Sequence, residues 1–153
     1  MSVPKSVTKV NKNGVTYTSN VDACQYYIFE LNRAALRDVA KFVKRKFRDS
    51  FYEHFSKDTG NAGRATQSVV LSNKDTKYPR VEIGLKKNQL KGVYAYEQEF
   101  GTSKIQRLGL LTDAVESNVA KIIEIESKYL SALDDEAQAL ALIDESEYSD
   151  DGE

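Results

Sequence analysis

Residues 22–55 read DACQYYIFELNRAALRDVAKFVKRKFRDSFYEHF and have the pattern of one long amphipathic helix. Asp22 is a candidate N-cap for this helix. Phe51 and Phe55 drift off its apolar face, which predicts either a bend near Ser50 or a second packing partner. The apolar face is defined by residues at three- and four-residue spacing: Ile28, Leu31, Ala35, Leu36, Val39, Phe42, Val43 and Phe47.

Five basic residues lie on the opposite face of the same helix. At about 100° per residue, they fall within an arc of roughly 80°. Such a surface is either a solvated face or a contact surface for DNA or an acidic neighbouring subunit, and the pattern leaves both interpretations open. We call these residues the basic stripe: Arg33, Arg37, Lys41, Lys44 and Arg48.

The remaining segments predict an α+β fold. Asn13-Gly14 is a turn signal, so residues 1–20 form either a short hairpin or an arm that becomes ordered on assembly. Alternating residues in 64–72 and 80–85 predict an antiparallel β-hairpin, and residues 91–96 predict a third strand or a short helical turn. Helical spacing returns near residue 108 and continues to about residue 143. The expected order is a long N-terminal helix, an antiparallel β-hairpin or small three-stranded sheet, a C-terminal helix and an acidic tail.

The charged residues are distributed unevenly along the 153 residues. Residues 134–153 contain nine acidic residues and no basic one, whereas residues 1–133 contain 22 basic and 14 acidic side chains, a net charge of +8. A formal net charge of −1 therefore hides a basic body and an acidic tail. We expect an N-terminal arm at 1–20, one α+β domain at 21–133, and an acidic extension at 134–153 with a helical start and a disordered end at 144–153.

The composition offers little for catalysis. A single cysteine, Cys24, allows no internal disulfide or thiolate cluster, and a single histidine, His54, excludes a multi-histidine zinc site. The two residues lie about 45 Å apart on the predicted helix, so they cannot form a catalytic pair, and Cys24 is expected to be buried or half-buried. Gly60-Asn61-Ala62-Gly63 lacks the lysine and serine of a phosphate-binding loop. We therefore expect no enzyme and no catalytic, cofactor-binding or metal-binding residue. With no long apolar run, we expect a soluble intracellular protein.

One segment resembles a known family. Residues 94–104, Tyr-Ala-Tyr-Glu-Gln-Glu-Phe-Gly-Thr-Ser-Lys, are similar to the signature of phage neck and tail-completion proteins, which join head to tail in long-tailed bacteriophages. The order of elements around this signature is similar as well, over roughly residues 25–130. The family usually has a Pro-containing segment after the signature, whereas residues 105–111 contain no proline. In physical terms, Phe100 is an expected apolar anchor, Gly101 permits a positive φ, and Thr102 can cap the next segment or form a turn into it.

The resemblance implies a virion structural protein of the neck, assembled in the host cytoplasm. It implies a cyclic homo-oligomer, a hexamer or secondly a dodecamer, that joins the head connector to the tail around the DNA channel. Expected partners are head-closure or connector proteins and tail-terminator or tail-tube proteins, with nonspecific contact to genomic DNA. The alternative is a small nucleic-acid-binding or DNA-mimic regulator. Loops 73–79 and 86–92 are expected to contact neighbouring rings, and the expected interface residues are the basic stripe with Tyr94, Glu99, Phe100, Gly101, Thr102, Asp134, Asp135 and Glu136.

Overall fold

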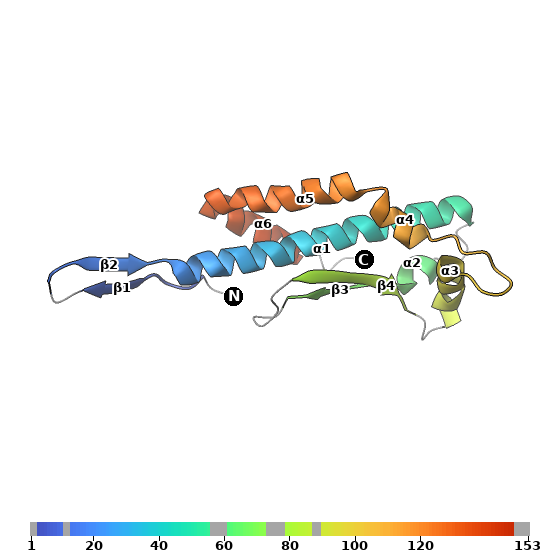
Figure 1. Ribbon diagram of the computed structural model, residues 1–153, viewed down its shortest axis with the longest axis horizontal. Coiled ribbons are helices and arrows are strands. Elements are labelled where there is room, and N and C mark those ends of the chain that lie inside the picture. Colours follow the sequence, from blue (N-terminus) through green and yellow to red (C-terminus); the bar gives the residue numbers. More distant parts are fainter. Residues whose placement is uncertain (1–2, 11–12, 56–60, 73–78, 87–89, 149–153) are drawn as a thin grey trace.

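The computed structural model describes residues 3–10, 13–55, 61–72, 79–86 and 90–148 (Figure 1). The fold is α+β, as predicted, with one long helix near the N-terminus, two small antiparallel sheets and several C-terminal helices. In chain order, the elements are β1 (Val7–Val10), β2 (Thr16–Ser19), α1 (Val21–His54), α2 (Asn61–Ala65), β3 (Thr66–Leu71), β4 (Arg80–Leu85), α3 (Leu90–Phe100), α4 (Leu110–Glu116), α5 (Val119–Ser131), the 3₁₀ turn η1 (Ala132–Asp134) and α6 (Glu136–Tyr148).

Helix α1 is the axis on which the rest of the chain is arranged. Its 34 residues span about 51 Å at 1.5 Å per residue. Helices α5 and α6 lie along one side of α1 and the β3–β4 hairpin along another, while the β1–β2 hairpin projects beyond its N-terminal end (Figure 1). The predicted helix is confirmed, but Asp22 is not its N-cap: α1 begins at Val21, and Asn20 precedes it without a side-chain capping bond.

Two apolar clusters lie on α1, one on each half of the helix. The first holds Val39, Phe42, Val43, Phe47 and Phe51 of α1, with Ala95 of α3 and Leu110 and Ala114 of α4. The second holds Leu31, Ala34 and Ala35 of α1, with Tyr129, Ala132, Ala139, Leu142 and Ile143. The predicted apolar face is thus buried over most of its length, although Ile28 is 48% exposed.

Phe51 and Phe55 lie off the apolar face of α1 because they have a packing partner of their own. Helix α1 continues past Ser50 to His54, and α3 is the second packing partner. The Tyr94 ring of α3 lies edge-on to the Phe51 ring at 6.4 Å between centroids and to the Phe55 ring at 5.5 Å.

The two hairpins differ in how they are supported. Strand β3 pairs with β4 so that Ser68 lies opposite Ile83, and the alternate half-buried residues of both strands form the face that packs toward α1. Strand β1 pairs with β2, with Val7 opposite Ser19, but all residues of this pair except Ser19 are exposed. Gly14 lies in the turn region with a φ of +77°, as a tight hairpin turn requires. Of the two interpretations of residues 1–20, the hairpin is observed.

Residues 91–96 form part of helix α3, so the structure holds no third strand in this region. The buried residues Ala95, Gln98 and Glu99 are spaced three and four apart, which is a helical spacing. The apolar run at Val93–Tyr96 is too short to distinguish helix from strand by pattern alone.

The predicted helix from residue 108 to 143 is in fact several pieces. Helix α4 ends near Asn118, whose side-chain amide donates to the Ala114 carbonyl at 3.0 Å. A second break at η1 turns the chain back, and α6 then packs on α1. Residues 134–148 are therefore part of the folded body. The expected disorder of residues 144–148 is wrong, because α6 continues to Tyr148 and buries Ile143 and Ser146. The rest of the expected disordered end, 149–153, lies outside the described residues. Within the described ranges, no helix combines the length and apolarity needed to cross a membrane.

Candidate functional site

The signature segment forms a corner between α3 and α4, and Glu99 closes it. The Glu99 side chain is 3% exposed. One carboxylate oxygen accepts the backbone N–H of Leu111 at 2.7 Å, and the other accepts the N–H and the hydroxyl of Thr112 at 3.2 and 3.0 Å. Gly109, at the N-cap of α4, has no side chain to satisfy these donors. Glu99 therefore caps α4 from the preceding helix.

Gly101 and Thr102 shape the turn that comes after α3. Gly101 has a φ of +76°, and a Cβ at this position would lie 3.0 Å from the backbone nitrogen of Arg107. The Thr102 hydroxyl accepts the N–H groups of Lys104 and Ile105 at 3.2 and 3.1 Å. The expected positive φ and the expected turn are both observed, and both hold the corner together within one chain.

Phe100 does not have the predicted role of a buried anchor. Its side chain is 58% exposed, and its ring lies against Tyr96 with 4.6 Å between centroids. The buried positions of this turn of α3 are taken by Gln98 and Glu99 instead. Tyr94 is 49% exposed, although its ring edge contacts the aromatic end of α1. Two aromatic side chains of the signature are thus presented at the surface.

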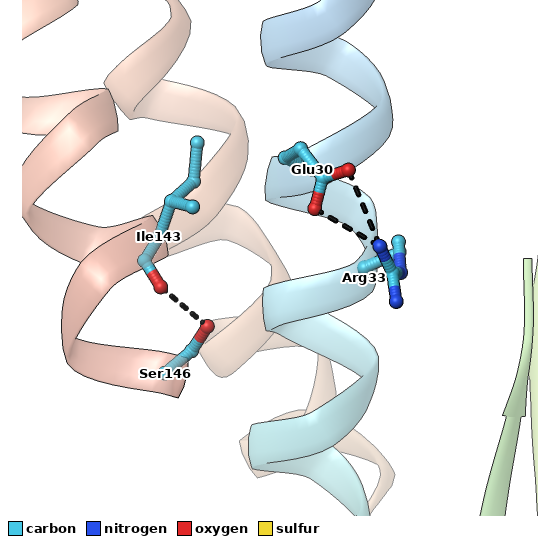
Figure 2. Close-up of polar contacts among 4 residues, drawn as sticks. All are labelled: Glu30, Arg33, Ile143 and Ser146. Carbon is cyan, nitrogen blue, oxygen red and sulfur yellow. Dashed lines mark hydrogen bonds and ion pairs between the residues drawn. The ribbon is translucent and has the colours of Figure 1, made fainter. Parts of the chain in front are cut away.

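The basic stripe lies on α1 between neighbouring elements, and all five of its side chains are half-buried. Arg33, at the start of the stripe, reaches back to the buried Glu30 at 3.2 Å, as Figure 2 shows. Arg33, Arg37, Lys41 and Lys44 line a hollow of about 580 Å³ beside strand β3. The stripe is therefore a surface that faces the hairpin, and it is only partly solvated.

A larger groove of about 1310 Å³ lies next to this hollow and shares Lys41 and Lys44 with it. We call it the basic groove. Its floor is α1 from Asp38 to Arg48, and its walls are α2 with the start of β3 and helix α5. Seven cationic and two anionic side chains line it: Lys41, Lys44, Arg45, Arg48, Arg64, Lys121 and Lys128 against Asp38 and Glu124.

The acids of the groove engage two of these cations. Lys121 lies 2.6 Å from Glu124 and Lys41 lies 4.0 Å from Asp38. Lys44 and Arg64 form no ion pair with any residue in the described part of the chain. Both carboxylates of the groove are thus already in contact with a cation, and the groove keeps an excess of positive charge.

Four of the seven groove cations were not predicted as site residues. Arg45 lies on α1 beside the stripe, and Arg64 is in the α2 segment. Lys121 and Lys128 come from α5, seven residues apart on one helical face. This i, i+7 spacing is visible in the sequence and predicts a common face, but the packing of α5 against α1 is not visible there.

The acidic residues at the start of α6 have roles within their own chain. Asp135 caps α6, because its carboxylate accepts the N–H groups of Ala137 and Gln138 at 2.9 and 3.3 Å. Glu136 accepts a hydrogen bond from the Tyr27 hydroxyl, and this bond is the main reason why the pKa of Tyr27 rises to about 12. Asp134 is exposed in η1.

A second tyrosine joins α5 to α1 at the rim of the basic groove. Tyr129 is 3% exposed, and its hydroxyl donates to Asp38. Burial, followed by this hydrogen bond, raises the pKa of Tyr129 above its usual range. The hydrogen bond from Tyr129 to Asp38 therefore fixes one wall of the groove.

A metal site is not found among the described residues. No group of three or more potential ligands among them could hold a metal ion. Cys24 and His54 lie at opposite ends of α1. Cys24 is exposed, contrary to expectation, because few residues pack on the first turns of α1. His54 Nδ1 lies 2.9 Å from the Ser50 carbonyl.

Most of the loops expected to contact other rings, residues 73–78 and 87–89, lie outside the described residues.

Comparison with known proteins gives no assignment: no family model matches the chain, and no curated protein or solved structure shows significant similarity to it.

Proposed function

We propose that this chain is a virion structural protein, a neck or tail-completion subunit that forms a ring between the head connector and the tail of a long-tailed phage. The observation that carries the proposal is the corner at residues 99–102 of the signature, where three of the four residues, all but Phe100, have a defined role. Glu99 caps α4, Gly101 takes a positive φ, and Thr102 closes the turn. The segment has no catalytic role in this proposal, and the protein is not an enzyme.

Ring formation is supported by surfaces that the single chain leaves open. The β1–β2 hairpin projects from the end of α1 with exposed Val10, Val15 and Tyr17 (Figure 1). A two-stranded hairpin is marginal in water without further packing. An interface that pairs two different patches, such as this arm and the body of the next copy, generates a closed ring when the rotation closes. A hexamer is the favoured ring and a dodecamer the second choice.

Charge supports the direction of contact between copies. The basic stripe and the basic groove lie on one surface of α1, whereas exposed acids Asp144 and Glu145 lie on α6. Two patches of opposite charge on one subunit favour head-to-tail contact between copies. In the neck, the same basic surface would also tolerate genomic DNA in the channel.

The mass of the purified assembly tests this proposal. We expect native mass spectrometry at low salt to give a six-fold multiple of the 17.2 kDa chain, with twelve-fold second. Arg37→Glu with Lys44→Glu should reduce ring formation, whereas Lys104→Glu with Arg107→Glu, at two exposed positions off the stripe and outside the loops expected to contact other rings, should not. A monomer at all concentrations up to about 100 µM would count against a ring, since assembly is driven by mass action.

The open basic groove also favours the second candidate, a nucleic-acid-binding regulator. Filter binding separates the two: the regulator requires affinity for DNA in the free monomer, with the salt dependence of phosphate contacts. Assembly into heads and tails requires no such affinity.

A further inference from the structure

The basic groove has the dimensions and charge of a site for an acidic peptide. Its α1 floor, from Asp38 to Arg48, extends for about 15 Å at 1.5 Å per residue. Seven cations face two carboxylates across this length, and Ser127 adds a hydroxyl donor. Cations arranged along a line favour a ligand with several negative charges in succession over a compact single anion.

Helix α6 runs toward this groove. It is parallel to α1, because residue numbers increase in the same direction along both helices from Glu30 to Arg33 and from Ile143 to Ser146 (Figure 2). Its first residue, Glu136, bonds to Tyr27, and Ser146 is 2% exposed. Tyr148 lies twelve positions after Glu136, so equal rise along both helices brings the end of α6 level with about residue 39 of α1. That is the end of the groove where Asp38 and Lys41 lie.

From this geometry we infer that the basic groove is an acidic-peptide site and that residues 149–153 of the same chain occupy it in the free subunit. This segment reads Ser-Asp-Asp-Gly-Glu and lies outside the described residues. Five extended residues reach about 17 Å, which matches the length of the groove floor. Asp150, Asp151 and Glu153 supply three charges, and Lys44 and Arg64, which form no ion pair within the described chain, are available to them.

This inference rests on the proposed function in one respect. Residues 149–153 cover the basic groove, which under the proposed function a neighbouring copy or DNA would contact. A segment held in its own groove is at a high effective concentration, so it competes with any external anion. The free subunit is then self-blocked, and assembly has to displace its tail.

Zero-length carbodiimide cross-linking tests the occupant, because it joins a carboxylate to an amine only when they are in contact. An equal mixture of ¹⁵N-labelled and unlabelled protein is cross-linked, and the monomer and higher bands are digested separately. We expect links from residues 150–153 to Lys41, Lys44, Lys121 or Lys128, within peptides of one isotope and from the monomer band. Links found only in mixed-isotope peptides would assign the groove to a second copy, and links to none of these four lysines would remove the segment from the groove. Either result overturns the inference.

A binding measurement supplies the second test. The triple variant Asp150→Asn, Asp151→Asn and Glu153→Gln is compared with a control that neutralises three exposed acids elsewhere, Asp22→Asn, Glu53→Gln and Glu116→Gln. At low salt, we expect the tail variant to bind a 20-nucleotide single-stranded oligonucleotide about tenfold more tightly than the control, and the difference to vanish at high salt. Equal affinity of both variants would show that no tail competes for the groove. Cross-links of the expected kind, with no ring formed even by the tail variant, would refute the proposed function alone, and a ring formed by the parent protein without such cross-links would refute this inference alone.

Discussion

The carboxylate of Glu99 caps α4 through the Leu111 amide, 2.7 Å away and 12 residues further along the chain. Helix caps are usually supplied by the residue next to the helix, but here that position is Gly109. The acceptor comes from a different helix, so the geometry of the α3–α4 corner and the start of α4 depend on each other.

Replacing Glu99 tests this dependence. We expect Glu99→Ala to lower the free energy of unfolding by about 2 kcal/mol, because it removes a carboxylate cap and leaves half-buried N–H donors without a partner. Glu97→Ala is the matched control on the same helix, since the Glu97 side chain makes no hydrogen bond or ion pair within the described part of the chain. Urea denaturation measures both. Equal destabilisation by the two variants would mean that helix propensity, and not the cap, accounts for the loss.

The geometry of the same corner also depends on Gly101. Gly101→Ala should cost about 2 kcal/mol, because alanine disfavours a φ of +76° and its Cβ would press on the Arg107 backbone. Gly84→Ala is the control: a Cβ there meets nothing within 4 Å and no positive φ is involved. Thermal unfolding of both variants checks this, and a neutral Gly101→Ala would show that the corner can relax.

Helix α6 should behave as part of the core. Leu142 is 6% exposed and belongs to the cluster on the first half of α1, whereas Leu130 on α5 is 60% exposed. We expect Leu142→Ala to lower the free energy of unfolding by about 2–4 kcal/mol through the cavity it leaves. Leu130→Ala, the same chemical change at the surface, should cost less than about 1 kcal/mol. If the two changes cost the same, α6 does not pack on α1 in solution.

The hydrogen bond from Tyr27 to Glu136 predicts a loss of stability at alkaline pH. The pKa of Tyr27 rises from 10.0 in the unfolded chain to about 12 in the folded one, so the folded state holds this proton more tightly. The stabilising contribution is complete below about pH 10 and is lost as the pH rises through about 12. Tyr27→Phe should therefore flatten the decline of the unfolding free energy between these values.

Tyr17→Phe is the control for that titration, because Tyr17 lies on the projecting hairpin and forms no hydrogen bond with the described residues through its hydroxyl. Its pH profile should follow the parent protein. An unchanged profile for Tyr27→Phe would mean that the bond to Glu136 does not persist in solution.

Local pattern was sufficient for part of this structure. The spacing of Leu31, Ala35 and Val39 predicted α1, and period-two alternation predicted the β3–β4 hairpin, because each element buries one face. The break between α5 and α6 was not predicted, since Leu133, Ala137 and Leu140 continue the helical period across it. Asp135 caps α6 at this break, and packing on α1 holds α6 in its new direction. This packing is tertiary and is not visible in the local pattern.

The candidate site divides in the same way. The basic stripe was predictable because its members share one helix, and Gly101 was predictable because a turn favours glycine. Arg64 and Lys128 were not assigned to the site, because they meet α1 only through tertiary packing. Glu99 was identified as a motif residue, but its capping role requires knowing where α4 begins.

The two apolar clusters on α1 affect the order in which parts of the molecule unfold. Each is a separate block of buried side chains on a common helix, and among their half-buried neighbours Ile125 packs against both. Such blocks exchange their amide hydrogens as distinct cooperative units. The block that contains α6 can unfold while the block around Phe47 stays closed, so α1 would fray from its N-terminal half and keep its C-terminal half. A protease would then cut first within residues 132–148, and the product would retain α3, α4 and the signature corner.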